Sequence, residues 1–149
     1  MRLATFARAA LAVLLIGAVA PLAGCGGQPL MTQVTPGPHI PGLKLSGKWY
    51  STEFGDMRLI QDDKRVTGTY EDPRGPDHNG RFDGRIEGDV LWMDWIKPGN
   101  TVAAVFPMRG KTWARITVKD GITRIEGEWG YDDNHSNGGA WSAEKSQFQ

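Results

Sequence analysis

The chain has 149 residues, the length of a single domain, with 17 basic and 17 acidic side chains and one cysteine. This balanced charge argues against a general nucleic-acid-binding protein, which would carry a basic excess or a basic stripe. One cysteine excludes an intramolecular disulfide, so an apolar core must hold the domain together.

Residues 1–24 have the pattern of a secretory signal peptide. Arg2 and Arg8 make its start positive, and an apolar run from Ala9 to Ala20 follows. The next residues, Leu22-Ala23-Gly24-Cys25, resemble the lipobox of bacterial lipoproteins. In that family the chain is cut before the cysteine, and the cysteine is acylated. The alternative is an uncleaved membrane helix, which Pro21 and the neighbouring glycines disfavour.

The lipobox resemblance implies a location. It predicts a protein of the cell envelope that is held to the membrane by lipid on Cys25. Gly26 follows the cysteine, whereas an Asp there favours inner-membrane retention in lipoproteins, so we expect the outer membrane in a cell with two membranes. Loss of Arg2 and Arg8 leaves 15 basic and 17 acidic residues, a net charge of −2.

Residues 25–44 are predicted to be the lipidated cysteine and a flexible tether, because Pro and Gly crowd this stretch. From residue 45 to residue 146 the pattern changes to short runs of alternating apolar and polar residues, separated by turn residues. This pattern is typical of many short strands in a barrel or sandwich. The expected strands are Ser46–Ser51, Asp56–Gln61, Arg65–Glu71, Gly80–Glu87, Val90–Lys97, Thr112–Lys119, Ile122–Gly130 and Gly139–Lys145.

A Gly-x-aromatic pattern recurs along these strands, for example at Gly47-x-Trp49 and Gly127-x-Trp129. Residues two apart share one face of a strand, and glycines of this kind allow the sharp bends of a small barrel. We therefore predict an all-β, eight-stranded antiparallel up-and-down β-barrel. Residues 101–108 are either a lid over its mouth or an extra strand, and an even strand number favours the lid.

In an up-and-down barrel, alternate connections lie at the same end. The connections at 62–64, 88–89 and 120–121 are short, whereas those at 52–55, 72–79, 98–111 and 131–138 are expected at the other end. Both chain ends should therefore lie at the short-turn end. Candidate ligand-binding residues cluster under the long loops: Trp49, Ser51, Tyr70, Trp95, Trp129 and Trp141. The alternative is that the rings only fill the interior.

Several of these segments resemble avidins and, more loosely, lipocalins. Residues 45–51 (LSGKWYS) and 66–71 (VTGTYE) resemble the first and third avidin strands, and Glu128-Trp129 and Ala140-Trp141 resemble the last two. The resemblance implies the same barrel, with Tyr70, Trp129 and Trp141 at its site. Ser51, Asp56 and Asp72 replace residues that bind biotin in that family, and a carboxylate cannot donate to the ureido oxygen. The resemblance therefore implies the barrel rather than biotin binding.

Other chemistry has little support, so we expect no enzyme and no cofactor. The sequence lacks a nucleophile elbow and zinc-type histidine spacing. Weak metal candidates are Asp77, His78, Asp132 and His135, which are more often turn residues. Trp92 and Trp113 are predicted on the outer face, either as a surface for a protein partner or a second copy, or as isolated tryptophans.

Two functions follow from these expectations. The first is a membrane-tethered barrel that binds a small apolar or aromatic ligand at its loop end. The second is an envelope module with a packed barrel that binds or inhibits a protein. Space beneath the loops would favour the first, and a packed lumen would favour the second.

Overall fold

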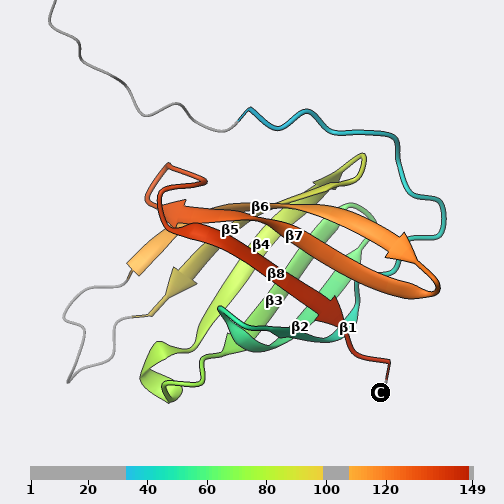
Figure 1. Ribbon diagram of the computed structural model, residues 1–149. Helices are drawn as coiled ribbons and strands as arrows, with labels where there is room; N and C mark the ends of the chain where they lie inside the picture. Colours follow the sequence, from blue (N-terminus) through green and yellow to red (C-terminus); the bar gives the residue numbers. More distant parts are fainter. Residues whose placement is uncertain (1–32, 99–107, 148–149) are drawn as a thin grey trace, which may run out of the picture.

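The computed structural model describes residues 33–98 and 108–147, which form a closed barrel of eight antiparallel strands (Figure 1). Each strand pairs with the next along the chain, and β8 pairs with β1 to close the ring. The all-β, up-and-down prediction is confirmed. The strands are β1 Gly47–Ser51, β2 Gly55–Asp62, β3 Arg65–Glu71, β4 Gly80–Glu87, β5 Val90–Lys97, β6 Met108–Lys119, β7 Ile122–Tyr131 and β8 Gly139–Lys145, and a 3-10 turn, η1, spans Pro76–His78.

The two ends of the barrel differ in their connections, as the sequence predicts. Figure 1 shows the tight hairpins β2–β3, β4–β5 and β6–β7 towards the right and η1 at the opposite end. In the β6–β7 turn, Asp120 and Gly121 both have positive φ, 53° and 77°. Two positive φ values are required by the hairpin turn that matches strand twist, and Asp-Gly suits them.

The first residues of the barrel lie at this short-turn end. The Leu45 N–H donates to Oε1 of Gln61, next to the β2–β3 turn, at 2.7 Å. At the other chain end, Lys145 donates through Nζ to the carbonyl oxygen of Lys44 at 2.8 Å. Both ends of the domain therefore lie away from the 72–79 loop, in agreement with the predicted orientation.

The segment before β1 differs from the flexible tether expected over residues 25–44. From residue 33 it crosses the short-turn end, where the Gly37 N–H donates to Asp89 and Arg115 donates to the carbonyl of Thr35. Ile40 and Leu43 pack against the core. The open end of a barrel exposes apolar side chains, and this segment covers them.

The strand β6 is longer than expected and begins at Met108, which pairs with Lys97. Residue 108 therefore belongs to a ring strand, and residues 101–107 of the proposed lid lie outside the described residues. The signal peptide and Cys25 also lie outside them. Within the part that is described, no helix has the length and apolar character needed to cross a membrane.

Close strand contacts explain two of the recurring glycines. A Cβ at Gly127 would lie within 2 Å of the carbonyl oxygen of Trp113 on β6, and one at Gly68 would lie 2.5 Å from that of Arg58 on β2. These positions therefore allow neighbouring strands to approach closely, a role that differs from the sharp bends expected from the sequence.

Candidate functional site

A phenylalanine that the sequence analysis did not select fills the barrel interior under the long loops. Phe54 lies in the β1–β2 connection and is only 8% exposed. Its ring packs against four others, with centroid distances of 5.5, 5.8, 6.0 and 5.3 Å to Tyr70, Phe82, Trp129 and Trp141. These are ordinary distances for packed aromatic rings, so the layer is occupied by the protein's own side chain.

Ser51, one of the candidate ligand-binding residues, stabilises the turn that positions the Phe54 ring. It is 1% exposed, and its hydroxyl oxygen accepts hydrogen bonds from the N–H groups of Glu53 and Phe54, both at 3.2 Å. The Glu53 carboxylate in turn accepts from the Ser142 N–H on β8 at 3.2 Å. Burial alone would raise the pKa of Glu53, but hydrogen bonds from Thr52, Ser142 and Ser51 outweigh it and leave the pKa lowered. Ser51 therefore fixes the turn that carries Phe54.

The candidate tryptophans use their indole N–H groups inside the barrel. Trp95 donates to the carbonyl of Gly130 at 3.0 Å, and Trp141 donates to that of Trp113 at 3.1 Å. Trp49 donates to the carbonyl of Leu45 at 2.8 Å, towards the short-turn end. The Trp49 indole therefore points towards the short-turn end and makes no ring contact with the other candidates among the described residues, while Tyr70, Trp95, Trp129 and Trp141 pack with Phe54 in one layer.

Polar side chains lie on the chain segments at the loop end. The Asp72 carboxylate accepts two hydrogen bonds from the Arg74 guanidinium, at 2.8 and 2.6 Å, and these lower its pKa. Lys97 is 9% exposed, and its Nζ lies 2.7 Å from Nδ1 of His78. Burial lowers the pKa of Lys97, and burial with the Asp72 charge raises that of Tyr70 to about 12.

Three of the four weak metal candidates contact other side chains. His78 faces Lys97, and Asp132 lies 3.8 Å from Arg109. The His135 ring packs edge-on against Trp92 at 5.5 Å. Among the residues that the structure describes, no three His, Cys, Asp or Glu side chains form a group that could hold a metal ion.

Trp92 and Trp113 are direct neighbours on the outer face, since they are paired across β5 and β6. Both are half-buried, and the β7–β8 loop covers part of the pair through His135. Trp113 donates to Oε2 of Glu128 at 3.3 Å, whereas the buried Nε1 of Trp92 has no hydrogen-bond partner among residues 33–98 and 108–147. The pair is thus a partly covered patch.

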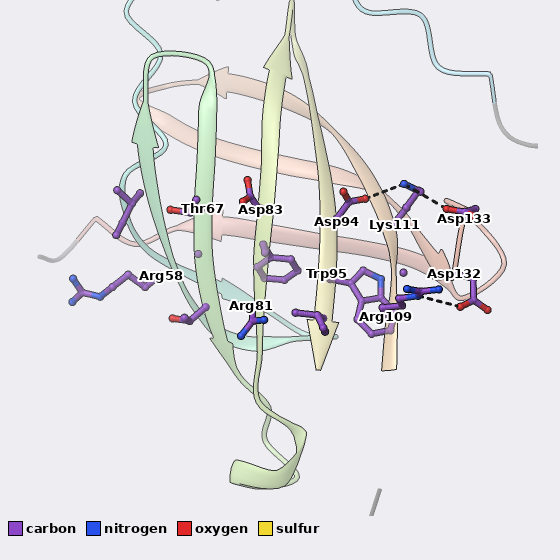
Figure 2. Close-up of a pocket in the computed structure, with 16 residues that line it drawn as sticks. Arg58, Thr67, Arg81, Asp83, Asp94, Trp95, Arg109, Lys111, Asp132 and Asp133 are labelled. Carbon is purple, nitrogen blue, oxygen red and sulfur yellow. Dashed lines mark hydrogen bonds and ion pairs between the residues drawn. The ribbon is translucent and has the colours of Figure 1, made fainter. Parts of the chain in front are cut away.

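A groove of about 750 Å³ crosses the outer wall over β2 to β6 (Figure 2). Strand register places its side chains in two rows. The row nearer the long loops is Arg58, Thr69, Arg81, Ile96 and Arg109, and the second row is Ile60, Thr67, Asp83, Asp94 and Lys111. The strand β3 contributes only the small residues Thr67, Gly68 and Thr69 here, between longer side chains of β2 and β4, and this difference in size forms the groove.

The charges in this groove are unevenly paired. Asp83 pairs with Arg65 at 2.7 Å, which lowers the pKa of Asp83, and Asp94 pairs with Lys111 at 3.2 Å. In contrast, Arg58 and Arg81 make no ion pair or hydrogen bond among the described residues. Arg58 and Arg81 therefore pair with Thr69 from its two sides, and the Arg58 side chain extends away from Arg81 at the edge of the groove (Figure 2).

Neither Phe54 nor the groove was expected from the sequence. A lone phenylalanine in a connection of polar residues and glycine was the available signal for Phe54. The outward positions of the groove residues follow from alternation, but their common row depends on strand register. Comparison with protein-family models, curated proteins and solved structures found no match to this chain.

Proposed function

We propose that the protein is an envelope lipoprotein whose barrel is a non-catalytic interaction module with a structural interior. On this proposal, a partner protein binds the outer groove over β2 to β6. The observation that carries the proposal is the position of Phe54, whose ring occupies the space beneath the loops where a small ligand would otherwise bind. A filled lumen leaves the outer wall as the surface available for recognition.

The anchoring part of the proposal rests on the lipobox-like residues 22–25. Because the chain packs against the short-turn end from residue 33, only residues 25–32 separate a lipid on Cys25 from the barrel. Eight residues reach at most about 28 Å when fully extended. The barrel is then held close to the membrane by its short-turn end, with the long loops directed away and the groove on its flank.

Photo-crosslinking in cells tests where the partner binds. The photoreactive residue p-benzoylphenylalanine is placed at Ile60 in the groove, at Tyr131 at the loop end, or at Glu126 on β7, four strands from β3. Position 60 is expected to give a defined adduct that Arg81→Glu abolishes, while positions 131 and 126 give none. An adduct at position 131 but not at position 60 would contradict the proposal.

A second candidate function, capture of a small aromatic molecule at the barrel mouth, has two observations in its favour. Phe54 is carried by a connection rather than by a strand, and the Asp72–Arg74 pair follows the strand that carries Tyr70. Displacement of the Phe54 ring would open a space of about one ring, lined by Tyr70 and Trp129. Binding of indole or benzene to the unaltered protein would support this candidate.

A further inference from the structure

The row of side chains nearer the long loops carries arginines at a regular strand spacing, and Arg109 at one end of it lies 3.8 Å from Asp132. Arg58, Arg81 and Arg109 occupy alternate strands, β2, β4 and β6, with Thr69 and Ile96 between them. Neighbouring strands lie about 4.8 Å apart, so the Cα atoms of successive arginines are separated by about 10 Å along the row.

Negative charges border this row. Asp83 lies two residues after Arg81 on β4, and Asp94 lies two residues before Ile96 on β5, each about 7 Å away. Their partners, Arg65 and Lys111, already neutralise them. A wide polyanion laid across the groove would meet these carboxylates, whereas a single extended chain can follow the arginine row alone. This arrangement of charges therefore favours a single extended chain whose negative groups are spaced apart.

Apolar and hydroxyl groups complete the lining. Ile60 is 59% exposed, and Ile96 and Thr69 lie between the arginines. A single small anion would not use this apolar surface, but the side chains of a peptide would. The chain's own segments 1–32 and 99–107 contain no Asp or Glu, so they cannot neutralise Arg58 and Arg81.

We propose that the groove binds an extended acidic peptide segment of a partner protein, with Asp or Glu at every third residue. A polyproline II segment rises about 3.1 Å per residue with three residues per turn, so every third side chain shares one face at intervals of about 9 Å. This interval is close to the spacing of about 10 Å between the Cα atoms of successive arginines, whose long side chains can adjust to it. The inference rests on the proposed function, because it names the chemistry of the partner at the same groove.

Fluorescence anisotropy with labelled synthetic peptides tests this proposal on the chain from residue 26 onward, which retains every described strand. The peptide EPAEPAE carries the predicted spacing, and EEEPAPA has the same composition and charge without it. EPAEPAE is expected to bind at least fivefold more tightly. Equal affinity of the two peptides, or no binding of either, overturns the proposal.

Matched variants locate the binding. Arg81→Glu is expected to weaken EPAEPAE binding at least fivefold, and Arg81→Gln is also expected to weaken it. Arg85→Glu is the control, because Arg85 lies on the same face of β4 outside the groove lining. A loss with Arg85→Glu equal to that with Arg81→Glu would show unspecific charge attraction and overturn the proposal, provided that the variants melt like the parent.

Other occupants are outcomes of the same assay. Tighter Arg81-dependent binding of phosphatidylglycerol vesicles or of single-stranded DNA overturns the peptide assignment, as does a dimer in sedimentation that Arg81→Glu dissociates. The crosslink at position 60 distinguishes failure of the peptide proposal from failure of the proposed function. An adduct there without EPAEPAE binding refutes the peptide chemistry and keeps the proposed function, whereas absence of both refutes both.

Discussion

Replacement of Phe54 by alanine tests the filled lumen. The ring is 8% exposed and contacts four aromatic neighbours. A buried phenylalanine removes roughly 150 Å² from water, and about 25 cal/mol per Å² gives about 4 kcal/mol. This agrees with the ~3–5 kcal/mol range for such truncations in cores. For a domain of this size the melting temperature should fall by about 10–20 °C.

The same variant should acquire a binding site. An apolar cavity left by a removed ring stays dry and can take up benzene. Phe54→Ala is therefore expected to bind benzene or indole, with recovery of part of the lost stability and a change in tryptophan fluorescence, since Trp129 and Trp141 line the space. A ligand at ten times its dissociation constant recovers about 1.4 kcal/mol.

Calorimetric melting with and without benzene measures both effects. Tyr50→Ala is the control, because Tyr50 is 61% exposed on the outer wall and its loss should change stability by about 0.5 kcal/mol or less. The reasoning is refuted if Phe54→Ala melts like the parent protein, or if the parent binds benzene as well as the variant does.

Three further predictions concern the anchor, the strand contacts and acid stability. Cys25→Ser should prevent acylation and release the protein from carbonate-washed membranes, and a variant that stays with the membranes would contradict the anchor. Gly127→Val or Gly68→Val should cost roughly 1–3 kcal/mol through overpacking, measured by urea denaturation, and an unchanged midpoint in both would contradict the close strand contacts. The hydrogen bonds from Arg74 lower the pKa of Asp72 below its unfolded value near 4. Their contribution to stability is therefore present above about pH 4 and is lost as the pH falls through the lowered value. Asp72→Asn should make the fall in stability between pH 5 and pH 2 shallower, and an unchanged fall would contradict this reasoning.

The strands could be predicted because one physical pattern repeats along the chain. Alternation places one face of each strand inside, and turn residues such as Asp120-Gly121 separate the strands. The closed order β1 to β8 follows, because short turns join antiparallel neighbours. These features are local in sequence, so the sequence alone carries them.

Features that depend on contacts between distant residues were harder to predict. The Pro/Gly-rich composition before β1 is typical of a linker, yet Ile40 and Leu43 cover the end of the barrel, and isolated apolar residues leave no periodic signal. Trp49 has the spacing of the other ring residues, but its indole bonds to Leu45 and so turns towards the short-turn end. Phe54 lies in a connection between two strands, where the alternation of inward and outward side chains does not apply.

The groove illustrates the same limit. Alternation assigns Arg58 and Arg81 to the outer face, but their common row with Thr69 between them depends on the pairing of β2, β3 and β4. A shift of one residue in either pairing would separate them. Charge pairing likewise depends on register, since Asp83 is neutralised by Arg65 of the neighbouring strand.

A ¹H–¹⁵N NMR titration of the chain from residue 26 onward with EPAEPAE most directly tests the claim that recognition takes place on the outer wall and not in the lumen. The indole N–H signals of Trp95 and Trp141 report on the interior, because both groups donate to carbonyls of the barrel. We predict shifts at backbone amides around Thr69, Arg81 and Ile96, with the indole signals unchanged. Shifts concentrated on the indole signals, with the amides of β3 and β4 unchanged, would contradict the account.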